Sequence, residues 1–376
     1  MATIAHRDPI APRRPLCDNP EEALAALETV REQTLALVSH LSEEELSEVL
    51  SPIMSPLVWD LAHIAAYEDL WLVHRHGGMD LLRGELAERY DAFETPRSMR
   101  GEVQLLVPSQ ARSYLQDVRS RTSEVLRTVG VGDGTVYEMV LRHESQHTET
   151  MRQTMALAGL LPAGEPPLGS ACEPGWCEVA AGVFAMGAQA EGFAYDNERP
   201  RHPVDVAAFE IARAPVSNAG WTEFVRDGGY ERREWWSAEG WEWKRENDIG
   251  AGASVAADEP ESPVCHVSWF EAEAYACARH ARLPSESEWE KAATAGLLSG
   301  VGQVWEWTSS HFNGYEGFVA HPYREYSEVF FGDEYRVLRG GSWATSPRVK
   351  TRTFRNWDLP VRRQIFAGVR LARDVV

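Results

Sequence analysis

The sequence predicts an α+β protein with two unlike domains, a helical bundle followed by a loop-rich α+β domain. From Asn19 to about Leu160, apolar residues recur at helical spacing among many Ala, Leu, Glu and Arg residues. Beyond residue 175, short β-like runs alternate with loops containing Gly, Asn and Pro. The stretch between them is rich in prolines and glycines, which cannot continue a helix. We therefore expect an N-terminal extension at 1–18, a bundle at 19–160, a linker at 161–175 and an α+β domain at 176–376.

Helix start signals support the bundle. Asn19 followed by Pro20 is typical of a helix N-terminus, and Ser42 with Glu45 three residues later forms a capping-box pattern. Pro56 can occupy a first turn ahead of the apolar helix that follows it. The long run PSQARSYLQDVRSRTSEVLRTV also has helical periodicity. These segments predict antiparallel helices joined by short connections.

The C-terminal half contains fewer regular signals. GVFAMG and YRVLRGGSWA are short β-like runs, and one clear helix is expected through WFEAEAYACARHA. Strands and helices that mix without strict alternation favour an α+β domain over a parallel α/β fold.

Composition limits the possible functions. The formal net charge is −20, which opposes binding to nucleic acid or to an anionic membrane. No run of 18 apolar residues appears, and the N-terminus lacks the apolar core of a secretory signal, so we expect a cytoplasmic protein without membrane segments. The five cysteines are odd in number and show no C-x-x-C pair, so no disulfide framework is expected.

The strongest chemical signal is the segment HESQH at 143–147. His143 and His147 are four residues apart, so on a helix they project from one face and can share a metal ion. The segment also fits the H-E-x-x-H pattern of zinc peptidases, in which Glu144 would act as general base. No peptidase-type third ligand follows, whereas His63 on another predicted helix offers one. Three imidazoles suit Zn, Fe, Cu or Ni, so ligand type alone leaves the metal open.

Several segments together resemble a known enzyme family. The bundle resembles the DinB-like domain of the ergothioneine-pathway sulfoxide synthases (EgtB), and the second half resembles a formylglycine-generating-enzyme-like (sulfatase-modifying) domain of C-type-lectin-like fold. The segments that carry the resemblance are SPLVWDLAH (55–63), HESQH (143–147), VWEWTSS (304–310), LRGGSW (338–343), TFRNWD (353–358) and RRQIFAG (362–368). Together they span nearly the whole chain.

The resemblance implies an oxidoreductase that uses Fe(II) held by His63, His143 and His147. The family joins the sulfur of a cysteine-containing thiol to hercynine (Nα-trimethylhistidine) with O2 and oxidises that sulfur to the sulfoxide. The partners expected from the resemblance are therefore hercynine, γ-glutamylcysteine and O2, with no nucleic acid and no membrane, and we expect a monomer.

The resemblance also implies site residues beyond the ligands. Tyr323 matches the family's catalytic tyrosine, whose phenol can deliver a proton or hydrogen atom, and Tyr326 is the fallback. Residues implied to bind substrates are Arg97 and Arg100 for the carboxylates of γ-glutamylcysteine, Gln146 for the imidazole, Asn356 and Trp357 for the amino-acid end of hercynine, and Asp358 for the thiol substrate. Trp357 and Phe354 are candidate aromatic faces for the trimethylammonium group.

Alternatives remain at this stage. The thiol could be free cysteine or a selenium donor, a zinc metallopeptidase is a remote alternative, and a lectin-like domain on a metal-stabilised bundle could bind a ligand without catalysis. One stretch departs from the family, because ATAGLLSGVGQ at 293–303 replaces a much longer segment. None of the expected site residues lies in it.

Overall fold

The computed structural model describes residues 19–166, 172–250 and 259–375. Contacts between Cα atoms divide the chain into two compact units, one ending at Glu165 and one beginning at Pro166. Within these described ranges, no helix is long and apolar enough to cross a membrane.

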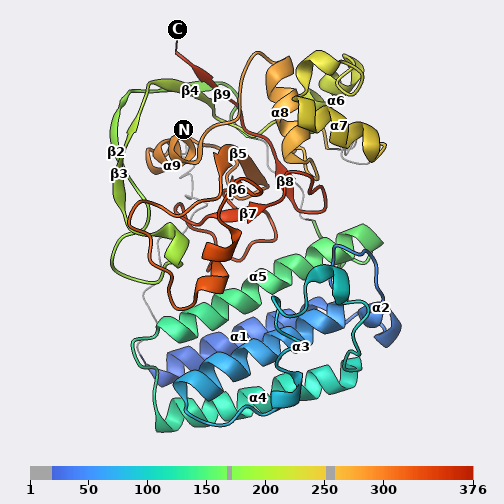
Figure 1. Cartoon of the computed structure of the whole chain (residues 1–376), viewed down its shortest axis with the longest axis vertical. Helices are drawn as coiled ribbons and strands as arrows, with labels where there is room; N and C mark the ends of the chain where they lie inside the picture. The colour runs from blue at the N-terminus through green and yellow to red at the C-terminus, as the bar shows by residue number, and fades with distance from the viewer. Residues whose placement is uncertain (1–18, 167–171, 251–258, 376) are drawn as a thin grey trace, which may run out of the picture. The chain divides into compact units, whose positions relative to one another are not determined.

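The first unit is a helical bundle, whose long helices run side by side (Figure 1). Its α-helices are α1 (Pro20–Leu37), α2 (Glu43–Ser47), α3 (Leu57–Glu68), α4 (Pro108–Thr128) and α5 (Thr135–Ala158). A π-helical segment, η1 (Asp69–His76), continues α3, and two short 3₁₀ turns, η2 (Gly84–Leu86) and η3 (Arg97–Met99), lie in the connection to α4.

The expected helix starts are present. The side chain of Asn19 accepts a hydrogen bond from the amide of Glu22, and Ser42 and Glu45 form a complete capping box. Pro56 is the N-cap residue of α3, so that helix begins one residue later, at Leu57. Helix α5 ends before Gly159, which adopts a positive φ of 69° that favours glycine.

In the residues that the structure describes, the second unit contains three small sheets together with several helices. Its strands are β1 (Trp176–Val179), β2 (Gly182–Met186), β3 (His202–Val206), β4 (Phe209–Ala212), β5 (Trp305–His311), β6 (Arg336–Arg339), β7 (Asn356–Asp358), β8 (Ala367–Gly368) and β9 (Ala372–Asp374). The sheets have the orders β1-β4-β9, β2-β3 and β7-β6-β5-β8, and among the strands of the described residues only the β5-β8 pair is parallel. Short 3₁₀ turns lie in the loops, namely η4 (Asp196–Glu198), η5 (Arg233–Trp235), η7 (Arg324–Tyr326) and η8 (Glu328–Phe330).

The second unit has more helices than the sequence pattern predicts. The expected helix is α8 (Trp269–Ala278), and α6 (Asn218–Arg226), α7 (Ala238–Glu246) and α9 (Glu286–Thr294) accompany it. Each of the three unexpected helices is only nine residues long, which is too short for a clear period. Their N-cap serines Ser217, Ser237 and Ser285 are the signals that mark them.

Candidate metal centre

Helices α3 and α5 bring the three predicted histidines together. His63 lies on α3, and His143 and His147 lie one turn apart on α5. One nitrogen from each ring falls within 4.8 Å of the other two. The Nε2 atoms of His63 and His143 are 3.0 Å apart. Two nitrogens that each lie about 2.1 Å from one ion, at a right angle, are separated by about 3 Å, so this spacing fits a shared metal.

The Nδ1 atoms of two of these rings have hydrogen-bond partners outside the cluster. His63 Nδ1 lies 2.6 Å from the carbonyl oxygen of Tyr90, and His147 Nδ1 lies 2.8 Å from Oδ1 of Asp60. When Nδ1 donates its proton to such an acceptor, Nε2 presents its lone pair to a metal. This outer arrangement therefore favours metal-binding tautomers that use Nε2.

Burial keeps the three imidazoles neutral. Burial and the neighbouring His147 lower the pKa of His63 to about 3. Burial, together with the guanidinium groups of Arg100 and Arg97, lowers the pKa of His147 to about 3. Burial also lowers the pKa of His143 well below its ordinary value. Neutral imidazole is the form that binds a metal, so at pH 7 the cluster does not first have to lose protons.

The chemistry of the donor set fits a divalent transition metal. Three neutral nitrogen ligands from two helices, with two of the rings oriented by outer hydrogen bonds, form the kind of site that suits iron, zinc, copper or nickel. Three protein ligands also leave coordination positions for small molecules.

Glu144 points away from this cluster. Its Oε1 accepts hydrogen bonds from Arg31 Nε and Thr34 Oγ1, both at 2.8 Å, and its Oε2 accepts one from Arg31 Nη2 at 3.1 Å. The carboxylate is buried. A zinc peptidase needs this glutamate beside the metal as general base, so the arrangement opposes the peptidase alternative.

Two aromatic rings stack on the histidines. The ring of Trp59 stacks on that of His63 with centroids 4.6 Å apart, and Tyr67 stacks on His143 at 3.5 Å. No role for Asp60, Trp59 or Tyr67 was predicted from the sequence. A signal existed for Asp60, because a carboxylate three residues before His63 in a mostly apolar helix lies on the same helix face.

The two arginines predicted to bind the thiol differ in exposure. Arg97 is exposed, whereas Arg100 is 6% exposed and places its guanidinium 3.6 Å from the ring centroid of Trp59. Both lie close enough to His147 to influence its pKa. Gln146, which is partly buried, precedes His147 on α5. The structure therefore brings these residues near the histidine cluster.

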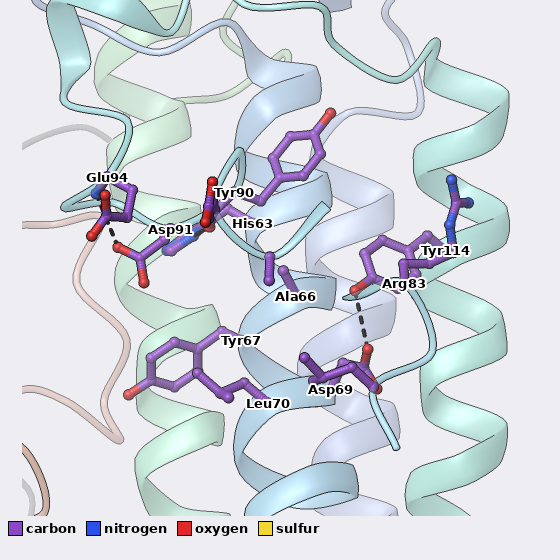
Figure 2. A pocket seen from close by; sticks show the side chains of 13 residues that line it. His63, Ala66, Tyr67, Asp69, Leu70, Arg83, Tyr90, Asp91, Glu94 and Tyr114 are labelled. Carbon is purple, nitrogen blue, oxygen red and sulfur yellow. Dashed lines mark hydrogen bonds between the residues drawn. The ribbon is translucent and has the colours of Figure 1, made fainter. Parts of the chain in front are cut away.

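A cavity of about 250 Å³ opens beside His63 within the bundle. Figure 2 shows His63 and Tyr67 among its lining side chains, with Asp69 and Tyr114 joined by a hydrogen bond at another side. The Tyr114 hydroxyl donates to Asp69 over 3.2 Å. Room for a small molecule thus exists next to one of the candidate ligands.

In the second unit, Tyr323, Tyr326 and Trp357 belong to one aromatic cluster. Tyr323 is the N-cap residue of η7, is partly buried and meets Tyr326 edge-on with ring centroids 6.2 Å apart. Tyr326 meets Trp357 edge-on at 5.8 Å and stacks on Tyr195 at 4.2 Å. Trp357 in turn stacks on Phe312 at 4.1 Å.

Strand β7 supplies three expected substrate residues in sequence. Asn356, Trp357 and Asp358 pair with β6 and are all partly buried. Asp358 is 3.7 Å from the guanidinium of Arg362. Phe354 is only 3% exposed and packs against Tyr195 and Trp305. Of the two aromatic faces considered for the trimethylammonium group, Trp357 is therefore the more accessible.

Comparison with known proteins decides the family. Residues 26–151 match the DinB superfamily, and residues 168–300 and 295–375 match the sulfatase-modifying factor enzyme 1-like domain. A hercynine oxygenase of Mycobacterium tuberculosis is 40% identical over 427 aligned residues, which cover 95% of this chain and 100% of the relative. A hercynine oxygenase of Mycolicibacterium thermoresistibile is 42% identical and covers 92% of this chain and 93% of its own length.

The chain belongs to the hercynine oxygenase family. The predicted combination of a DinB-like bundle with a formylglycine-generating-enzyme-like domain is confirmed, and the chain is an oxygenase. Its relatives indicate a role in ergothioneine biosynthesis, small-molecule substrates and dependence on a metal. Ergothioneine biosynthesis protein 1 of Schizosaccharomyces pombe is 22% identical over 94% of this chain and 56% of its own length.

The comparisons also bear on the short segment after Ala293. The alignment with the M. tuberculosis relative runs over 427 positions, more than the 376 residues of this chain, so that relative contains additional residues. The two matches to the sulfatase-modifying factor domain meet at residues 295–300. That place coincides with the shortened stretch.

Proposed function

We propose that this oxygenase joins the sulfur of γ-glutamylcysteine to hercynine and oxidises that sulfur, giving γ-glutamyl hercynylcysteine sulfoxide. The metal in this proposal is Fe(II), held by His63, His143 and His147. The observation that carries the proposal is the cluster of three neutral histidines, with ligand atoms within 4.8 Å of one another, in a chain related over most of its length to hercynine oxygenases.

The proposed reaction balances without an external reductant. Hercynine loses a hydrogen from its imidazole carbon, the thiol loses its hydrogen, and a carbon–sulfur bond forms. One oxygen atom of O2 becomes the sulfoxide oxygen and the other leaves as water. Forming one carbon–sulfur and one sulfur–oxygen bond removes four electrons from the substrates, which is the number that O2 requires. Bound iron(II) supplies the capacity to activate O2 and to gather the reactants on one ion.

The bundle residues near the histidines suit the thiol substrate. γ-Glutamylcysteine carries two carboxylates, and guanidinium groups bind carboxylates through paired hydrogen bonds. Arg97 is exposed on η3, so its guanidinium is accessible to a ligand, and Arg100 adds positive charge close by. We assign both to the di-acid thiol, with Asp358 as a further positioning group. Gln146 is assigned to the imidazole of hercynine.

The second unit is assigned the remaining roles. Tyr323, partly buried at the start of η7, is the proposed proton or hydrogen-atom donor. Asn356 and Trp357 on β7 are assigned to the amino-acid end of hercynine. An aromatic face favours a quaternary ammonium, which cannot donate a hydrogen bond, by about 0.5 to 2 kcal/mol.

The identity of the sulfur or selenium donor is the part of this proposal to test first. The iron-loaded enzyme would be supplied with hercynine, O2 and equimolar γ-glutamylcysteine and cysteine, and the product masses compared. The proposal predicts mainly the γ-glutamyl conjugate. If the product derives mainly from cysteine, or forms only with a selenium donor, that donor and not γ-glutamylcysteine is the substrate.

A further inference from the structure

Three side chains form a continuous stack that ends on a metal ligand. The guanidinium carbon of Arg100 lies 3.6 Å from the ring centroid of Trp59. His63 lies at the opposite end of the stack. Its ring centroid is 4.6 Å from that of Trp59, and the two ring planes are only 15° apart. The plane of a metal-binding imidazole is thus packed against an indole that a buried cation covers.

Arg100 is fixed by its own hydrogen bonds. Its Nε donates to the carbonyl oxygen of Thr95 over 3.0 Å, and its Nη1 donates to the hydroxyl of Ser55 over 2.8 Å. Ser55 lies two residues before α3. These bonds tie the start of the helix that carries His63 to the segment that carries Arg100.

The segment that contains Arg100, residues 89–100, also supplies hydrogen-bond acceptors to Trp59 and His63. The indole N–H of Trp59 donates to the carbonyl oxygen of Arg89 over 3.2 Å, and Tyr90 supplies the carbonyl that holds His63 Nδ1. Asp60, beside Trp59 in the chain, holds His147. The groups that orient two of the three histidines therefore lie on the two segments that the hydrogen bonds of Arg100 link.

We propose that Arg100 is a positioning residue of the metal centre, which fixes the ring plane of His63 through Trp59. Arg97, which is exposed, contacts the thiol carboxylate without this second role. The inference rests on the three-histidine metal site of the proposed function and separates the roles of two arginines that the family resemblance treats alike. Groups that orient a ligand change metal affinity 10- to 100-fold when they are replaced.

A matched pair of substitutions tests this assignment. Arg100→Lys and Arg97→Lys both keep the positive charge, and only the first removes a planar group from the stack. Co(II) binding and the absorption spectrum of bound Co(II) would be measured for both variants and for the unaltered chain, without hercynine, thiol or O2. We expect Arg100→Lys to bind Co(II) about 10- to 100-fold more weakly, with a changed spectrum. Arg97→Lys should stay within about twofold of the unaltered chain.

The proposal is wrong if Arg100→Lys keeps Co(II) affinity within about twofold together with an unchanged spectrum. It is also wrong if Arg97→Lys loses as much affinity as Arg100→Lys. Thermal unfolding checks that each variant folds, and Trp59→Phe replaces Arg100→Lys if that variant does not. Phenylalanine binds a cation more weakly and lacks the indole N–H, so a loss of affinity of at least about threefold is expected and an unchanged affinity overturns the proposal. Because no turnover is measured, a failure to form sulfoxide would reject the proposed reaction and leave this inference intact.

Discussion

Glu144 and Arg31 form a two-point ion pair inside the bundle, with contacts of 2.8 Å and 3.1 Å. Glu144 lies between the two histidines of α5 in sequence, yet its carboxylate faces α1. Arg31 also pairs with Glu68 at 2.8 Å, and Glu68 pairs with Arg119. The glutamate of the H-E-x-x-H pattern therefore serves the packing of the bundle, while the two histidines beside it belong to the candidate metal centre.

Removing the charge of Glu144 should lower the free energy of unfolding and leave metal affinity nearly unchanged. Breaking one side of a buried ion pair costs about 3 to 5 kcal/mol, and the lower end is expected because Glu68 still faces Arg31. Glu144→Gln should thus lose roughly 3 kcal/mol in denaturant unfolding and retain its metal. The control is Glu165→Gln, which breaks the partly exposed pair with Arg152 and should cost less than about 1 kcal/mol. A Glu144→Gln variant as stable as this control would contradict the structural role.

Acid should destabilise the bundle through Glu68. Burial raises the pKa of this carboxyl, but Arg119 and Arg31 outweigh burial and lower the pKa to about 2. A carboxyl whose folded pKa lies below its unfolded value of 4.5 stabilises the fold above that value and loses this contribution as the pH falls toward 2. The contribution is roughly 3 kcal/mol. Urea unfolding between pH 5 and pH 2 should show a decline that Glu68→Gln lacks; equal slopes would contradict the prediction.

Asp60 should matter for metal affinity. Its carboxylate holds His147 Nδ1 over 2.8 Å, and Asn in its place keeps the size but weakens this acceptor. Asp60→Asn is expected to bind Fe(II) anaerobically about 10- to 100-fold more weakly. Asp117→Asn, an exposed carboxylate on α4, is the control and should bind as the unaltered chain does. Equal affinities for the two variants would remove Asp60 from the outer sphere of the site.

Tyr323 should control which product forms. Tyr323→Phe removes the phenol that the proposed function uses as proton or hydrogen-atom donor, so oxidation should shift toward the thiol and give the sulfinic acid. Tyr326→Phe is the matched control, since it removes a second phenol from the same cluster. Mass spectrometry of both reactions checks this. An unchanged yield of sulfoxide from Tyr323→Phe would remove Tyr323 from its role. A shift toward sulfinic acid with Tyr326→Phe alone would assign that role to Tyr326.

The spacing of His143 and His147 predicted that they could share a metal ion, because they lie one turn apart on one helix. His63 needed the family resemblance, since nothing in a sequence pairs two helices that are 80 residues apart. The carbonyl of Tyr90 was beyond prediction for a physical reason. A main-chain acceptor is present at every position, so only the path of the loop selects this one.

Arg100 and Glu144 show a further limit of prediction from the sequence. The family resemblance assigned Arg100 to the thiol carboxylates, and the H-E-x-x-H pattern offered Glu144 as a general base only in the remote peptidase alternative. A motif specifies residue types and not the direction of each side chain. Packing against Trp59 and pairing with Arg31 decide those directions.

The helices α6, α7 and α9 were missed although Ser217, Ser237 and Ser285 mark their starts, because short helices produce little periodicity.

The proposed reaction is best tested by measuring oxygen uptake by the Fe(II)-loaded chain together with the product formed. The chain would be reconstituted anaerobically, mixed with hercynine and γ-glutamylcysteine without any reductant, and then exposed to O2. The proposed reaction predicts one sulfoxide conjugate for each O2 consumed, and loss of both uptake and product in His63→Ala. No uptake by the iron-loaded chain, a requirement for an added reductant, or full activity in His63→Ala would contradict it.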